Sequence, residues 1–228
     1  MIAKLFRRPD RVARDVLACY RNASKGDRLH VRVRWATCPV PEIEAEVPTT
    51  GRVLEVGCGH GLVSAYVARA CPAREVVGVD IDERKLVVAR AAAGELRAGE
   101  GRLRFASSAD GAVPPGPWDA IVIVDVLYLL DTDHELALLD ACAAELAPRG
   151  VLVVKETDVV PAWKHRIAKL QEVLATRVLR ITAGDALTFT PIAELAAHLA
   201  DRGLEVSVRR VDEGYPHPHS LLVARSLP

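Results

Sequence analysis

Residues 52–61 read RVLEVGCGHG. The apolar run Val53–Val56 predicts a buried β-strand, and the glycines at positions 57, 59 and 61 predict a tight turn after it. The next segment, Gly61–Ala70, has apolar residues at helical spacing. Backbone amides at a strand–turn–helix junction form a polar cradle for a ligand. The spacing is G-x-G-x-G, with Leu62 where a dinucleotide fold has its last glycine. Glu55 would repel a pyrophosphate and suits a ligand that carries a cationic amine.

Segments typical of strands and helices alternate from residue 52 onward. Continuous apolar strands of this kind, alternating with helices, indicate an α/β fold with a parallel sheet covered on both faces. A closing helix at Pro191–Arg202 precedes two strands, whose short connection predicts an antiparallel final pair. The strands expected are Val53–Val56, Glu75–Asp80, Leu103–Ser107, Trp118–Asp125, Val151–Glu156, Leu204–Val211 and Ser220–Ala224.

The whole chain, 1–228, is expected to form a single domain with four parts. Residues 1–45 form an N-terminal helical cap, in which Val12, Val16, Cys19 and Tyr20 share one face of a helix that lies over the domain. Residues 46–160 form the core, and residues 161–190, which carry an apolar stripe among basic residues, form a lid insertion. Residues 191–228 are the closing helix and β-hairpin.

Composition argues against several classes of protein. The net charge is 0 and aromatic residues make up 4%, which argues against binding to nucleic-acid phosphates or bases. The five cysteines are scattered and odd in number, which favours a reducing, cytoplasmic location over a disulfide framework. The basic start has no apolar stretch of a secretory signal after it, and no apolar run is long enough to span a bilayer.

The stretch VLEVGCGHG resembles the first motif of the class I S-adenosylmethionine-dependent methyltransferases. The resemblance extends through WDAIVIVD and ELAPRGVLVVKE to about residue 156. It implies a doubly wound, Rossmann-like mixed sheet with strand order 3-2-1-4-5-7-6 and an antiparallel last strand. It also implies S-adenosyl-L-methionine as cofactor and S-adenosyl-L-homocysteine as product.

The resemblance further implies cofactor contacts. Glu55 would anchor the amino group, Asp80 would take both ribose hydroxyls, and Ile81 would pack on the adenine. Asp110 would meet the adenine amine, although it stands one residue out of the family's usual phase. The complete expected set is Glu55, Gly57, Cys58, Gly59, Gly61, Asp80, Ile81, Ser108, Ala109, Asp110, Asp125 and Val126.

Candidates for catalysis follow the fourth, fifth and sixth strands, because ligands of open α/β sheets bind at the carboxyl ends. They are Asp125, Glu156, His217 and His219. Each also has a simpler interpretation, such as a bond to backbone or cofactor for Asp125 and a packed or solvated ring for the histidines. No metal site is expected. Arg28, Arg32 and Arg34 are candidates to meet the cofactor carboxylate or an acid of the substrate.

The function expected is methyl transfer to a small organic acceptor, most readily at oxygen, with a lipid-like, isoprenoid or secondary-metabolite substrate. One alternative is a methyltransferase acting on RNA or protein. Another is a catalytically silent homologue that only binds the cofactor. The basic N-terminal helix is a candidate for weak contact with a membrane surface, and the sequence indicates no oligomeric state.

Overall fold

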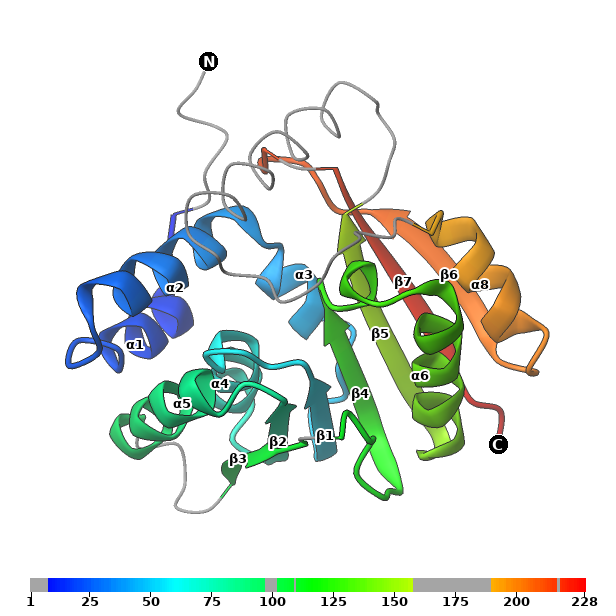
Figure 1. Ribbon diagram of the computed structural model, residues 1–228, viewed down its shortest axis with the longest axis horizontal. Helices are drawn as coiled ribbons and strands as arrows, with labels where there is room; N and C mark the ends of the chain where they lie inside the picture. The colour runs from blue at the N-terminus through cyan, green and yellow to red at the C-terminus, as the bar shows by residue number, and fades with distance from the viewer. Residues whose placement is uncertain (1–7, 97–101, 109, 158–189, 217) are drawn as a thin grey trace.

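The computed structural model describes residues 8–96, 102–108, 110–157, 190–216 and 218–228. Helices and strands alternate as the sequence predicts (Figure 1). The strands are β1 (Gly51–Val56), β2 (Arg74–Asp80), β3 (Leu103–Ser107), β4 (Trp118–Val124), β5 (Leu146–Thr157), β6 (Glu205–Arg210) and β7 (His219–Arg225). The helices are α1 (Arg11–Ala18), α2 (Lys25–Thr37), α3 (Val40–Glu44), α4 (Leu62–Ala70), α5 (Glu83–Glu95), α6 (Thr132–Ala144) and α8 (Ile192–Ala200).

The seven strands form one sheet in the order β3-β2-β1-β4-β5-β7-β6. The first five strands run parallel, and β7 is antiparallel to both β5 and β6. The predicted fold class and strand order are therefore confirmed. The lid predicted at residues 161–190 lies outside the described residues except for Thr190.

Successive residues of the central strands serve the two faces of the sheet in turn. Val151 and Val153 of β5 pack in the core with α1, α2, α3 and α4, whereas Leu152 and Val154 pack with α6 and α8. Both faces are thus apolar, which explains why these strands read as unbroken apolar runs. Within the described part of the chain, no helix has the length and apolar character needed to cross a membrane.

Two details of the prediction were wrong. The described part of the N-terminal cap, residues 8–45, contains three helices instead of one, because Ser24 caps a new helix after α1 through its bond to the Asp27 amide. Residues 148–150 read Pro-Arg-Gly, which predicts a turn before the fifth strand, but they lie inside β5, where Arg149 adopts a φ of 62° opposite a register shift between Trp118 and Ala120. The extra residues are absorbed as a bulge, so pairing of β4 with β5 continues past them.

A buried arginine joins the cap to the sheet. The side chain of Arg74, at the start of β2, is 1% exposed and forms an ion pair with Glu44 of α3 at 2.7 Å. Its guanidinium also donates to the carbonyl oxygens of Val47, Pro48 and Val67, at 2.8, 2.6 and 2.9 Å. A buried charge is tolerated only where its donors are satisfied in this way.

Replacing this arginine tests how much the network contributes to stability. Arg74→Met should lower the free energy of unfolding by roughly 2–4 kcal/mol, because Glu44 and three carbonyl groups lose their donor. Urea denaturation followed by circular dichroism measures the change. Arg104→Met, which breaks an exposed pair with Glu75 on the neighbouring strand, is the control and should cost less than about 1 kcal/mol. Equal losses in the two variants would contradict the assignment.

Candidate active site

The carboxyl ends of β1 and β2 meet at the glycine turn. The amides of Gly57 and Cys58 both donate to the Val79 carbonyl, at 2.8 and 3.0 Å, which ties the turn to the end of β2. The three glycines of the turn, Gly57, Gly59 and Gly61, all have positive φ, between 53° and 77°. This left-handed backbone favours glycine at each position.

Packing supplies a second reason for two of these glycines. A Cβ at Gly57 would lie 2.3 Å from Val126, and one at Gly61 would lie 2.4 Å from Phe105 of β3. At Gly59 the nearest atom would be 3.9 Å away, on Lys85. The packing of Val126 and Phe105 against the turn therefore requires glycine at positions 57 and 61. Gly59 is the position with open space beside it.

Asp80 binds this turn from the end of β2. Its Oδ2 accepts from the Gly59 amide at 2.7 Å, and its Oδ1 accepts from the Asp82 amide at 2.8 Å. Each carboxylate oxygen keeps a second acceptor position. The next side chain, Ile81, is 69% exposed, which is unusual for a large apolar residue at the end of a buried strand.

Glu55 is a buried carboxyl near the end of β1. Its Oε2 accepts from the amide of Ser64 at 2.7 Å and also from the Ser64 hydroxyl, in the first turn of α4. Burial raises the pKa of Glu55 to about 7, although the bonds from Ser64 oppose the shift. This carboxyl is thus poised between its neutral and ionised forms near neutral pH.

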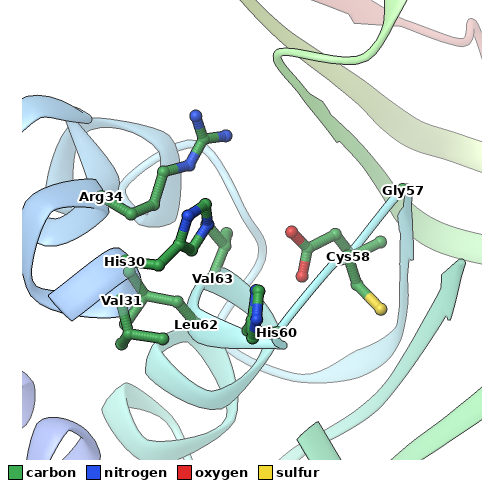
Figure 2. Close-up of a pocket in the computed structure, with 9 residues that line it drawn as sticks. His30, Val31, Arg34, Gly57, Cys58, His60, Leu62 and Val63 are labelled. Carbon is green, nitrogen blue, oxygen red and sulfur yellow. The ribbon is translucent and has the colours of Figure 1, made fainter. Parts of the chain in front are cut away.

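The pocket at the turn is closed on one side by the cap (Figure 2). From α2, His30 and Arg34 line it, facing Glu55, Gly57 and His60. The rings of His30 and His60 lie 4.6 Å apart. The Tyr20 hydroxyl donates to the His60 carbonyl at 2.8 Å, which fixes the cap against the turn.

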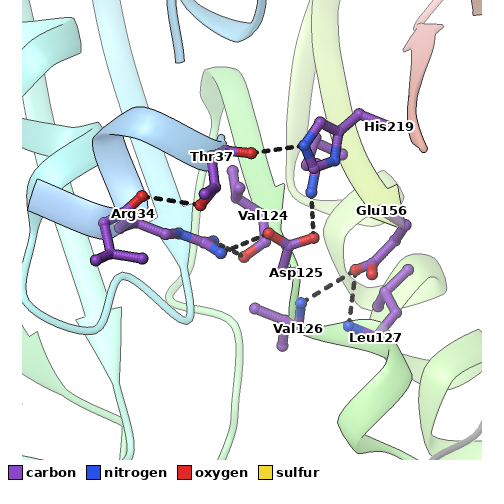
Figure 3. Close-up of polar contacts among 10 residues, drawn as sticks. Arg34, Thr37, Val124, Asp125, Val126, Leu127, Glu156 and His219 are labelled. Atoms are coloured by element: carbon purple, nitrogen blue, oxygen red, sulfur yellow. Dashed lines mark hydrogen bonds and ion pairs between the residues drawn. The ribbon is translucent and has the colours of Figure 1, made fainter. Parts of the chain in front are cut away.

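Asp125 lies at the next strand end, after β4, with a φ of 53°. Its carboxylate lies between Arg34 of α2, at 2.5 Å, and Lys155 of β5 (Figure 3). Burial alone would raise the pKa of Asp125, but the charges of Lys155 and Arg34 outweigh burial and hold the pKa below its usual range. Asp125 is therefore a fixed anion that joins three elements.

Glu156 supports the turn that follows Asp125. Its Oε1 accepts from the amides of Val126 and Leu127, both at 3.0 Å. Burial and the nearby charge of Asp125 raise the pKa of Glu156 to about 8. The same carboxyl thus orients the backbone beside the glycine turn and remains largely protonated at neutral pH.

Comparison with known proteins agrees with this geometry. A model of the methyltransferase domain matches residues 53–150. The ubiquinone biosynthesis O-methyltransferase of Xylella fastidiosa is 33% identical over 167 residues, which are 72% of this chain and 65% of that protein. The trans-aconitate 2-methyltransferase of Streptomyces avermitilis is 31% identical over 136 residues, which are 58% of this chain and 49% of that protein.

Among solved structures, the magnesium protoporphyrin IX methyltransferase of Synechocystis with bound S-adenosylhomocysteine superposes with a TM-score of 0.63 at 19% identity. The match covers 96% of this chain and 89% of that one. Residues 53–150 thus match a methyltransferase domain, and the strand order is the one expected for the class I S-adenosylmethionine-dependent methyltransferases. The chain spans less than two thirds of the length of the two curated relatives.

The remaining predicted site residues fall into two groups. Ser108, Asp110 and Val126 are described, and in the turn after β3 the Ser108 hydroxyl donates to the Ala112 carbonyl while the Ala112 amide donates to Asp110. Ala109 and His217 lie outside the described residues. The roles expected of all these residues remain predictions.

His219 lies at the start of β7 and not in the loop before it, where the sequence placed it. The ring is buried, its Nε2 lies 2.6 Å from the Thr37 carbonyl at the end of α2, and Tyr215 packs against it edge-on. A ring nitrogen next to a carbonyl must donate, which sets the tautomer. His219 thereby joins the final hairpin to the cap.

Sequence reasoning missed Lys155 and His30 as site residues. Lys155 reads as one charge at the end of an apolar strand, and only the pairing of β4 with β5 brings it to Asp125. Among the described residues, no group of three or more His, Cys, Asp or Glu side chains could hold a metal ion. The expected absence of a metal site stays a prediction for the chain as a whole.

Glu156 generates a prediction about pH. The folded state raises the pKa of this carboxyl, so folding takes up a proton between pH values of about 5 and about 8, and stability falls as pH rises through this range. Glu156→Gln keeps an oxygen that accepts from both amides but removes the ionisation. The variant should gain about 1–3 kcal/mol relative to the unmodified chain between these pH values.

Denaturation at several pH values measures that difference, with the exposed Glu75→Gln as the matched control. The control, which loses only an exposed ion pair with Arg104, should differ from the unmodified protein by less than about 1 kcal/mol at every pH. If the free energy of unfolding changed with pH in the same way for Glu156→Gln and the unmodified protein, the pKa of Glu156 would not be raised and the prediction would be wrong.

Proposed function

We propose that this protein transfers the methyl group of S-adenosylmethionine to an oxygen atom of a small organic acceptor. The observation that carries the proposal is the meeting of Glu55, Asp80 and the glycine turn at the carboxyl ends of β1 and β2. Similarity to an O-methyltransferase of ubiquinone biosynthesis supports oxygen as the acceptor atom and a lipid-like, isoprenoid compound as the acceptor class.

The donors and acceptors at the turn fit the two ends of the cofactor. We assign Glu55 to the ammonium group, since an approaching cation favours the ionised form of this carboxyl. Arg34 lines the same pocket and supplies a cation for the carboxylate. Asp80 offers two acceptor oxygens to a ribose diol, and the exposed Ile81 offers an apolar surface to the adenine.

The other assigned contacts complete this proposal. The backbone of Gly57, Cys58, Gly59 and Gly61 would pass beneath the methionine part, and Asp125 and Val126 would border the reactive end. The segment Ser108 to Asp110 would surround the adenine. We further propose that residues 1–228 act as one methyltransferase domain with residues 1–45 as its cap, and that the five free cysteines reflect a cytoplasmic location.

Bound S-adenosylmethionine supplies an electrophilic methyl group on a sulfonium. The contribution of the chain is to align the acceptor, exclude water and receive a proton. Asp125 is a poor base, because Lys155 and Arg34 hold its pKa low. We infer that Asp125 orients the site and that the ionised fraction of Glu156, whose pKa is about 8, is the stronger base of the two carboxyls.

Asp80→Ala tests the cofactor site without knowledge of the acceptor. The affinity for S-adenosylmethionine or S-adenosylhomocysteine should fall by roughly 1–3 kcal/mol, because two hydroxyl groups lose their acceptor. Calorimetry measures the affinity, and circular dichroism checks the fold, since Asp80 also holds the turn. Asp80→Asn, which keeps the shape and one acceptor oxygen, should give an intermediate loss. Glu83→Ala, an exposed neighbour, serves as control, and unchanged affinity in Asp80→Ala would refute the ribose assignment.

Transfer itself is tested with methyl-labelled cofactor and fractionated extracts of the source organism. Label should appear in the fraction of small organic molecules that is soluble in organic solvent. Treatment of the extract with ribonuclease or protease beforehand should leave the yield unchanged. Label in RNA or protein, or cofactor binding without any transfer, would overturn the proposal.

A further inference from the structure

Helix α2 presents a different chemistry on each of its sides. Val31 and Trp35 are buried in the core, and His30 and Arg34 line the cofactor pocket. Leu29 and Val33 are four residues apart and share a face. They are 65% and 51% exposed, although they belong to the residue types most often found inside proteins.

Cationic side chains lie beside this exposed apolar pair. The helical repeat brings Lys25, Arg28 and Arg32 to the flank away from the pocket, since successive residues are rotated by about 100°. Among the described residues, none of these three cations forms an ion pair with a carboxylate, whereas Arg21 is paired with Glu95 at 2.7 Å. The face therefore combines two exposed aliphatic side chains with three positive charges.

A groove between α1 and α2 continues the same surface. Its floor includes Leu17, Tyr20 and Val31, and its rim carries Arg21, Arg28 and Arg32. The helices α1 and α2 lie at one end of the molecule, on the side opposite α6 and α8 (Figure 1). An apolar floor with an arginine rim can accept a chain that is hydrocarbon at one end and anionic at the other.

We propose that this face, made of Leu29, Val33, Lys25, Arg28 and Arg32, binds the surface of an anionic lipid bilayer. The two aliphatic side chains enter the headgroup region, and the cations meet the lipid phosphates. Charge complementarity selects the occupant, because only an anionic bilayer has the net negative surface potential that attracts these three cations. The proposal concerns only this surface and does not depend on methyl transfer.

The geometry of α2 gives such binding a consequence for the site. His30 and Arg34 follow Leu29 and Val33 by one residue each, so the wall of the pocket and the bilayer contact are adjacent sides of one helix. A protein held in this way would keep the cap at the membrane surface. An acceptor partitioned in the lipid would then reach the cap without crossing bulk water.

Co-sedimentation of the full chain with vesicles tests the proposal. Binding to vesicles of phosphatidylcholine with one third phosphatidylglycerol should exceed binding to pure phosphatidylcholine, and it should weaken as salt is added. Leu29→Glu with Val33→Glu should reduce binding about tenfold or more, because apolar contact is lost and repulsion is gained. Arg28→Gln and Arg32→Gln should each reduce binding to the anionic vesicles by about fivefold.

Val87→Glu is the matched control, because Val87 is also exposed, at 58%, but lies on α5. It should bind like the unmodified chain. S-adenosylmethionine affinity and circular dichroism are measured on every variant, so that loss of the fold or of the cofactor site is recognised separately. The proposal is overturned if the unmodified chain ignores anionic vesicles, if neutral vesicles bind equally well, or if Val87→Glu reduces binding as much as the α2 variants.

Discussion

The buried carboxylate of Asp125 is the contact on which the arrangement of the site depends. Three elements far apart in the sequence meet at it: β4, which carries the residue, β5 through Lys155, and α2 through Arg34. An isolated buried charge is costly, and the two cations compensate this anion from two sides. The left-handed backbone at Asp125 adds strain that the surrounding bonds must offset. The cap is therefore joined to the core at the point where the reactive end of the cofactor is proposed to lie.

The glycine turn shows how packing and ligand binding share the same residues. The motif reads as a bare stretch of backbone for a ligand, yet two of its three glycines are needed because Val126 and Phe105 lie against them. Asp80 likewise holds the turn by accepting from the Gly59 amide, independently of any ligand. A site whose acceptors already fix its own backbone is preorganised, so less ordering remains to be done on binding.

The sequence predicted the sheet well, because its signals are local and repeated. Each strand is an apolar run bounded by turn residues, and the short final connection left an antiparallel pair as the simple solution. The cap was predicted less well, since a capping serine at position 24 divides it into helices that an apolar pattern alone does not separate. In the site, Glu55, Asp80 and Asp125 could be found because they end strands within a motif. Arg34, Lys155 and Arg74 act through partners 91, 30 and 30 residues away, and nothing local in the sequence names those partners.

One helix can serve the core, the pocket and the surface because of its rotation per residue. In α2 the consecutive residues Leu29, His30 and Val31 point to solvent, to the pocket and to the core, and Val33, Arg34 and Trp35 repeat the order one turn later. Moving the register of this helix by one residue would place an aliphatic side chain opposite Asp125 and a cation in the core. The buried pair of Arg34 with Asp125 therefore fixes the rotation of α2, and with it the side that the cap presents to solvent. The charge of Arg34, which lines the proposed cofactor pocket, thus also determines which side of α2 is exposed to a carrier of the acceptor.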